Sequence, residues 1–222
     1  MKKLSSPALY IKEAFEIYFE KKNLIYFLKL ALLFLALSIA MSIFSFVLAT
    51  GAGSNAVRQP AFILPLVASA IPLAVVGIWF QAATYEAVIR AVDGRGLTVK
   101  ETLLTAWKKA WCFFLVSLAR GLIMALGFVI LIIPGIIFGV WFSFSLFIQI
   151  SKGTSVRESL AKSRSLTKGR FWPILGRFSV FLLIYVLIQM VSANIPYIGP
   201  VFAIFMGPFF LIPFYLLYKD LS

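Results

Sequence analysis

Four ionisable side chains fall inside long hydrophobic stretches of the chain: Lys29, Glu86, Arg120 and Arg177. Charged groups in such stretches commonly mark ligand, ion or proton sites. The three bases could form a cluster that holds an anionic headgroup or solute, or they could pair with Glu86. Alternatively, each base lies near the end of its stretch and extends its side chain to the membrane surface. These four residues are the candidate intramembrane polar or lipid-binding residues.

Glu86 is the only acidic residue in these stretches and ends the sequence Gln81-Ala82-Ala83-Thr84-Tyr85-Glu86. It could bind a proton or a cation. It could equally be a boundary residue that pairs with Arg90, four residues later on the same helix, or with a base from another part of the chain.

Other chemistry has little support in the residue types. The chain has no histidine and a single cysteine, Cys112, which argues against histidine-based metal sites, Ser-His or Cys-His catalysis and an intrachain disulfide. It contains no P-loop and no dinucleotide-binding glycine pattern. We therefore expect no enzymatic activity, no catalytic residue, no cofactor and no metal.

The four candidate residues lie in a chain made largely of long hydrophobic runs. Hydrophobic residues make up 62% of the 222 residues and the mean hydropathy is +0.99, well above a soluble chain. Six hydrophobic runs are expected to span a membrane as helices, at about residues 23–49, 61–91, 112–133, 136–150, 171–191 and 201–218. Turns are expected at 50–60, at Pro134-Gly135 and at 194–200. The predicted fold is an all-α polytopic membrane protein, with residues 1–222 in a single integral membrane domain.

A short motif recurs along the chain. Thr98-Val99-Lys100-Glu101-Thr102-Leu103 matches Ser155-Val156-Arg157-Glu158-Ser159-Leu160, and a looser copy lies at Ile11 to Phe15. The repeat predicts three units, 6–92, 98–150 and 155–218, each a helical hairpin preceded by an amphipathic helix on the cytosolic membrane surface. Ser6 before Pro7, and the pairs Thr98/Glu101 and Ser155/Glu158, predict the helix starts.

The basic residues predict the orientation. Seventeen of the 21 Lys and Arg residues lie on one side of the expected spans, and only Arg58 lies in a loop on the other. The positive-inside rule then predicts a multi-pass protein of the cytoplasmic membrane with both termini in the cytosol. Anionic lipid headgroups are the expected partners and nucleic acid is not; association with a second copy or another membrane protein stays open.

The run from Ile133-Pro134-Gly135-Ile136 through Ser155 to Ser163 and on to Lys168-Gly169-Arg170-Phe171-Trp172 resembles a known group of proteins. It is similar to the membrane domain attached to some glycerophosphodiester phosphodiesterases, and to related stand-alone six-span bacterial and archaeal proteins of unassigned function. In that group the catalytic histidines and acidic metal ligands lie in a separate soluble barrel. The resemblance therefore implies a six-helix membrane module, without the phosphodiesterase activity.

Two hypotheses on function follow. The first is a non-enzymatic membrane module: a scaffold, an accessory protein or a lipid-interacting protein. The second is a small transporter or channel for a lipid-like or anionic solute. The second needs a polar path through the membrane, and Lys29, Glu86, Arg120 and Arg177 are the ionisable residues available to line it.

Overall fold

A computed structural model describes residues 4–51, 63–96, 98–195 and 198–222, and the regular secondary structure within these ranges is entirely helical. The helices are α1 (Pro7–Phe19), α2 (Lys21–Gly51), α3 (Ile63–Val92), α4 (Val99–Ile130), α5 (Ile132–Trp141), α6 (Ser145–Lys152), α7 (Val156–Thr167), α8 (Phe171–Ala193) and α9 (Ile198–Leu221). Six helical segments are long and apolar enough to cross a membrane. The predicted all-α polytopic membrane fold is confirmed. Arg58 and residues 52–60 of the turn predicted at 50–60 lie outside the described residues, as do residues 196–197 of the turn predicted at 194–200.

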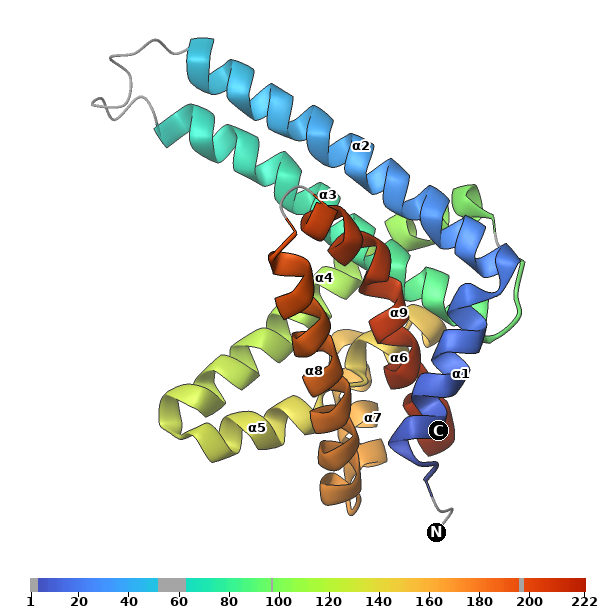
Figure 1. Ribbon diagram of the computed structural model, residues 1–222. Helices are drawn as coiled ribbons and strands as arrows, with labels where there is room; N and C mark the ends of the chain where they lie inside the picture. The colour runs from blue at the N-terminus through green and yellow to red at the C-terminus, as the bar shows by residue number, and fades with distance from the viewer. Residues whose placement is uncertain (1–3, 52–62, 97, 196–197) are drawn as a thin grey trace.

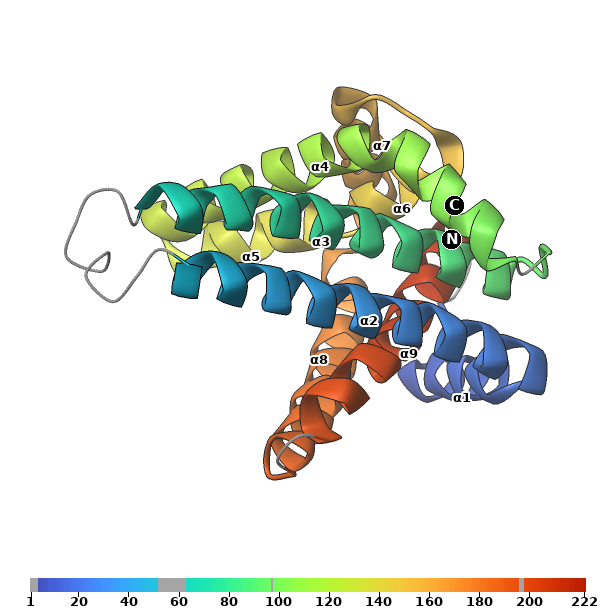
Figure 2. The ribbon, with the colours of Figure 1, turned by 90° about the horizontal axis from the view of Figure 1, so that it is seen from above.

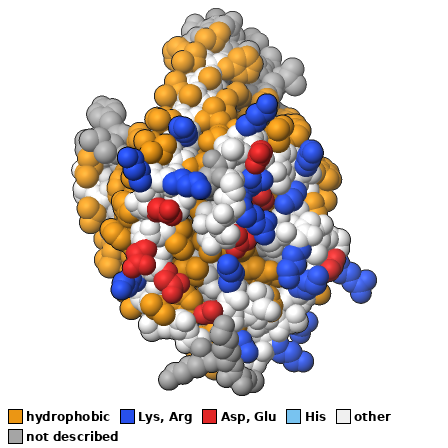
Figure 3. All heavy atoms as spheres, turned by 90° about the vertical axis from the view of Figure 1, so that its right-hand side faces the viewer, with side chains coloured by type: hydrophobic (Ala, Val, Ile, Leu, Met, Phe, Trp, Pro, Cys, Tyr) orange, Lys and Arg blue, Asp and Glu red, His pale blue; other side chains and the backbone are white. Residues whose placement is uncertain are grey.

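The spans form three antiparallel hairpins, α2–α3, α4 with α5 and α6, and α8–α9. Figures 1 and 2 show that the hairpins diverge from a common end, which contains α1, α7 and both chain termini. We call this common end the charged base. Seen from that side, Lys, Arg, Asp and Glu side chains gather across the surface while hydrophobic side chains surround them (Figure 3).

Tight packing between different hairpins is concentrated at the charged base. In α3, the small residues Ala82, Ala83 and Ala87 are fully buried, and neighbouring helices pack directly on them. At the opposite end of the hairpins, Val129 near the tip of α4 is 83% exposed. Lipid tails solvate apolar side chains as well as other apolar side chains do, so the diverging ends of the hairpins need no protein cover.

The predicted lead-in helices are only partly separate elements. The Ser6 side chain caps α1 and the Ser155 side chain caps α7, as the motif predicted. The segment beginning at Thr98, however, is continuous with its span as the first part of α4. The lead-in helix predicted for the second unit is thus not a separate helix, and Thr98 makes no side-chain cap hydrogen bond. Residues 99–130 contain no proline, which is consistent with this continuity.

Helix α1 packs into the protein through tyrosines spaced eight residues apart. The Tyr10 hydroxyl donates to Asp220 Oδ2 at 2.6 Å, and the Tyr18 hydroxyl donates to the Phe205 carbonyl. Burial, then hydrogen bonding to Asp220, raises the pKa of Tyr10 to about 12. Burial also raises the pKa of Tyr18. Both tyrosines therefore stay neutral donors that fasten α1 to α9, whereas Phe15 on another face of α1 is 56% exposed.

The turn between α4 and α5 differs from the sequence prediction. The chain reverses at Leu131 alone, and Pro134-Gly135 lies in the first turn of α5, where proline is tolerated because its N–H needs no helical partner. Gly135 packs on the Phe128 ring so closely that a Cβ there would lie 2.5 Å from ring carbons. This close approach brings the two helices together. The fourth span is also longer than predicted, residues 132–152 rather than 136–150.

A break between α5 and α6 interrupts the fourth span and leaves backbone groups without helical partners. Ser163 of α7 satisfies two of them: Phe144 N donates to Ser163 Oγ at 3.2 Å, and Ser163 Oγ donates to the Trp141 carbonyl at 2.7 Å. Ser163 is fully buried. Helix α7 therefore closes the broken span with a hydroxyl, which explains why its inward face carries small polar residues.

We expect Gly135→Ala to lower the stability of the protein in detergent, because the added methyl group must displace Phe128 in a packed turn. Overpacking of this kind costs about 1–3 kcal/mol. The matched control is Gly139→Ala on the same helix, where the added Cβ would meet only Met124 at 3.4 Å. Equal melting temperatures for the two variants would contradict the close approach described here.

We expect Ser163→Ala to destabilise the protein by about 1–3 kcal/mol, because it leaves a buried N–H and a buried carbonyl without partners. Ser165→Ala is the control: its hydroxyl donates to the Lys162 carbonyl on an exposed face of the same helix. Thermal unfolding of both variants in one detergent makes the comparison. A Ser165→Ala loss as large as that of Ser163→Ala would refute this role for Ser163.

Candidate functional site

Glu86 is the centre of a buried ionic network. Its side chain is 6% exposed, and it pairs with Arg90 Nε at 2.9 Å and with Lys109 Nζ at 3.4 Å. Arg90 also contacts Glu101 at 3.1 Å, and Lys109 donates to the Ile150 carbonyl. Both predicted pairings occur together: the i+4 pair within α3 and a base from another unit. The carboxylate is occupied by these contacts and joins α3, α4 and α6.

Arg177 holds the start of the chain. Its Nε donates to the Ser5 carbonyl at 3.0 Å, and its Nη2 donates to the Leu4 carbonyl at 2.9 Å. It thereby supplies backbone acceptors just ahead of α1 with charge-assisted hydrogen bonds. Its guanidinium is directed toward the charged base, in line with the snorkelling alternative.

The environment of Lys29 differs from those of Glu86 and Arg177. It lies on the exposed surface of α2, and within the described residues no ion pair joins it to a carboxylate. Among the described residues, no hydrogen bond or ion pair joins any two of Lys29, Glu86, Arg120 and Arg177. The four predicted residues are therefore not brought together as one site.

Arg120 lies in a pocket between α3 and α4. The pocket has a volume of about 430 Å³, and its polar lining comprises Gln81, Tyr85, Ser117 and Arg120. Tyr85 of α3 and Arg120 of α4 line this pocket together. Ser117 Oγ is buried and has no hydrogen-bond partner. This is the point at which polar side chains from two spans converge inside the apolar region.

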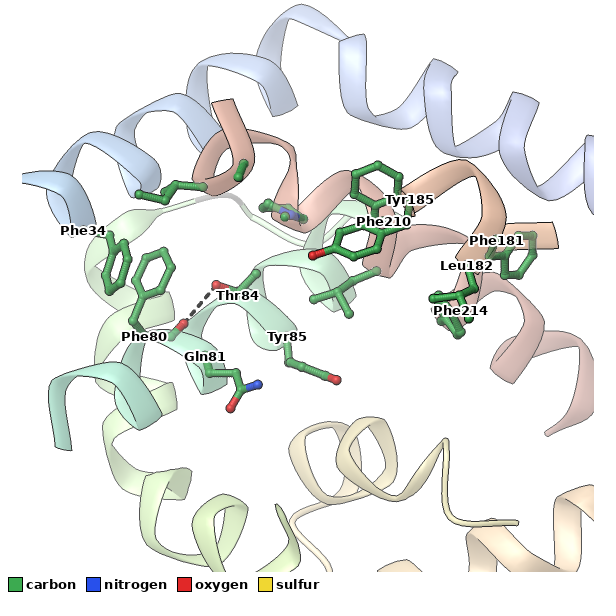
Figure 4. A pocket seen from close by; sticks show the side chains of 15 residues that line it. Phe34, Phe80, Gln81, Thr84, Tyr85, Phe181, Leu182, Tyr185, Phe210 and Phe214 are labelled. Atoms are coloured by element: carbon green, nitrogen blue, oxygen red, sulfur yellow. Dashed lines mark hydrogen bonds between the residues drawn. The ribbon is translucent and has the colours of Figure 1, made fainter. Parts of the chain in front are cut away.

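A second, mainly apolar pocket adjoins the first through Gln81 and Tyr85, which line both. It has a volume of about 500 Å³ and lies between α2, α3, α8 and α9. Figure 4 shows Phe34 and Phe80 stacked at one end of it, and Tyr185 with Phe210 on another wall. Gln81 and Tyr85 project from the same side of α3. An apolar pocket therefore lies next to a smaller pocket that contains a basic side chain.

Aromatic rings separate these pockets from the charged base. The Tyr85 ring packs on Phe147 with centroids 4.7 Å apart, and Phe147 packs on Tyr215 with centroids 5.3 Å apart. The Tyr215 hydroxyl donates to Asp93, and Asp93 pairs with Lys219 at the surface of the charged base. Ring packing therefore fills the route from the pocket to the base along this line.

A groove of about 730 Å³ lies at the edge of the charged base, between α5, α7 and α8. Its lining combines the bases Arg164 and Lys168 with Trp141, Phe171 and Trp172, and contains no acidic residue. The Arg164 guanidinium lies over the Trp141 ring, 4.5 Å from its centroid. Gly169, at φ 78°, lets the chain turn between α7 and α8 so that Lys168 and Trp172 border the same groove.

Sequence reasoning missed several residues of these sites. Ser117 and Tyr85 were not recognised because neither is charged. The signal was their spacing: Gln81 and Tyr85 lie four residues apart on α3, and Ser117, Arg120 and Gly121 share one face of α4. In the described part of the chain, no group of three or more acidic or cysteine side chains is placed to hold a metal.

Comparisons with protein-family models, characterised proteins and solved structures find no match to this chain. The resemblance to phosphodiesterase membrane domains stays a prediction from the motif.

We expect Glu86→Gln to destabilise the protein by about 3 kcal/mol, because it leaves two largely buried bases without their shared carboxylate. The control is Glu158→Gln, which removes an exposed pair with Lys162 at 2.6 Å and costs less than about 1 kcal/mol. Unfolding in detergent at neutral pH measures both. Similar losses for both variants would show that the Glu86 network contributes no more than an exposed pair.

Proposed function

We propose that this protein is a non-enzymatic, lipid-interacting module of the cytoplasmic membrane, which binds anionic phospholipid headgroups at its charged base. The observation that carries the proposal is the groove between α5, α7 and α8. Its bases, Arg164 and Lys168, are neighbours of three large aromatic side chains, and the lining is free of acidic residues.

The aromatic side chains support a position of the groove at the membrane boundary. Trp172 is 77% exposed at the start of α8, and exposed tryptophan is typical of the headgroup level. A lipid phosphate beside Arg164 and Lys168 could extend its acyl chains along the apolar surfaces of α5 and α8. Charge-assisted hydrogen bonds favour this arrangement over simple apolar contact.

Local charge supports an anionic headgroup over a neutral one. Residues 152–172 contain six Lys and Arg residues and one Glu, and that Glu158 is already paired with Lys162. The positive-inside rule favours placing this surface in the cytosol, together with both termini. Each nearby base attracts an anionic leaflet by about 1 kcal/mol.

The transporter hypothesis receives less support. It relied on a polar path formed by Lys29, Glu86, Arg120 and Arg177, but Glu86 and Arg177 are occupied by structural contacts and Lys29 is exposed on the outside of α2. A lipid-binding role needs no such path.

The test is lipid retention by the purified protein. Native mass spectrometry in neutral detergent, with phosphatidylglycerol titrated against phosphatidylcholine, should show selective retention of the anionic lipid. The double variant Arg164→Gln/Lys168→Gln should bind phosphatidylglycerol about thirtyfold more weakly, because two bases contribute about 1 kcal/mol each.

The matched control is Lys152→Gln/Arg157→Gln, which removes the same charge from exposed positions outside the groove. It should retain phosphatidylglycerol like the wild type. Equal losses in both double variants would indicate diffuse attraction without a site, and no selectivity in the wild type would reject the proposal. Because Arg164 contacts Trp141, melting temperatures without lipid must show that the groove variant is folded.

A further inference from the structure

Arg120 carries a charge that no acidic side chain balances. Of the eight acidic residues in the chain, none of those described forms an ion pair with it, and Glu86 is occupied by Arg90 and Lys109. Arg120 lies 19 residues after Glu101 in the continuous helix α4, within the apolar part of the span. A guanidinium in such surroundings is costly without an anion, so an anionic ligand beside it would be stabilised.

A second observation points to a ligand at the same place. Within the described part of the chain, Ser117 Oγ, one turn before Arg120, is buried and has no hydrogen-bond partner. Buried hydroxyls without partners are rare because each costs free energy. Ser117, Arg120, Tyr85 and Gln81 line one pocket, and all four can donate hydrogen bonds. Such a set of donors suits an oxyanion and does not suit a cation.

The surroundings define the rest of the ligand. The polar pocket adjoins, across the shared residues Gln81 and Tyr85, the chamber lined by Phe80, Phe210 and Phe214 (Figure 4). The chamber volume of about 500 Å³ falls in the range of small-molecule sites. An apolar chamber of this size beside a basic end fits one hydrocarbon chain that carries a negative head.

We propose that the two pockets together bind a single-chain anionic amphiphile. Its carboxylate or phosphate accepts hydrogen bonds from Arg120, with Ser117 and Tyr85 as further donors, and its tail lies between α3, α8 and α9. The ligand enters sideways from the bilayer, between the diverging hairpins (Figures 1 and 2), because aromatic packing fills the route from the charged base. This site is separate from the groove at α5, α7 and α8 and does not depend on it.

The experiment measures displacement of a fluorescent fatty acid, 11-(dansylamino)undecanoate, from the purified protein in neutral detergent. Oleate, oleoyl lysophosphatidate, dioleoylphosphatidylglycerol and oleyl alcohol are the competitors. We expect one or both single-chain anions to displace the probe at least tenfold better than oleyl alcohol or the two-chain lipid. The better of oleate and lysophosphatidate identifies the head as a carboxylate or a phosphate.

The variants test the proposed contacts. Arg120→Gln should weaken binding of the preferred anion at least tenfold, while Arg120→Lys keeps part of the affinity. The matched control is Lys29→Gln, which removes a base at a comparable place in the first unit, outside both pockets, and should leave affinity unchanged. Ser117→Ala should leave the melting temperature unchanged, because its hydroxyl has no partner, and weaken binding severalfold.

Equal affinity for oleate and oleyl alcohol would overturn the proposal, as would unchanged binding by folded Arg120→Gln. If Arg120→Gln does not fold, the proposal would be overturned by unchanged affinity in both of the single variants Ser117→Ala and Arg120→Lys. Loss of binding in Lys29→Gln equal to that in Arg120→Gln would also reject a local site.

Discussion

The carboxylate of Glu86 holds a base from its own helix and a base from α4 inside the most closely packed part of the protein, and Lys109 in turn reaches the backbone of α6. Removing three charged groups from solvent is favourable only when each has partners, so the network requires α3, α4 and α6 to meet in one arrangement.

Other hydrogen bonds and ion pairs also join helices at the charged base. Asp220 joins α9 to α1, Asp93 joins α3 to α9, and Ser163 joins α7 to the broken fourth span. The three hairpins are thus bound together at one end by hydrogen bonds and ion pairs rather than along their lengths by apolar packing.

This distribution of contacts explains why the hairpins diverge. Between helices in a bilayer, apolar contact has little advantage over contact with lipid, so directional polar contacts and close approach of small residues determine where helices stay together. The polar contacts lie at the charged base. A close approach away from the charged base, between Gly127 and Gly135, lies within one hairpin and does not attach that hairpin to the others. The space left between the hairpins is therefore a consequence of where polar groups occur, and the pockets beside Tyr85 form at its inner end.

The three bases at comparable places in the three units have different environments. Arg177 is used to hold the chain start, Lys29 faces outward, and Arg120 is directed into a pocket with a tyrosine and an unpartnered serine. Neighbouring residues decide the difference. The span that carries Arg177 lies beside the backbone at Leu4 and Ser5, which offers free carbonyls, whereas the span that carries Arg120 crosses α3 opposite Gln81 and Tyr85. A repeated sequence position therefore does not give a repeated role, because each unit packs against different partners.

Composition and hydrophobic run length were sufficient to predict six helical spans in three hairpins, because the cost of an unpaired backbone in lipid leaves helices as the solution for long apolar runs. Local rules also predicted the caps at Ser6 and Ser155 and the pairing of Glu86 with Arg90, since each depends on residues within one helical turn or so. Tertiary structure decided the rest. Four features depend on which helix faces lie opposite one another. They are the reversal at Leu131, the contact of Gly135 with Phe128, the hydrogen bonds of Ser163 to the broken span, and the pocket that Tyr85, Ser117 and Arg120 line together. That arrangement is set by packing between segments far apart in the chain, and no local pattern in this sequence encodes it.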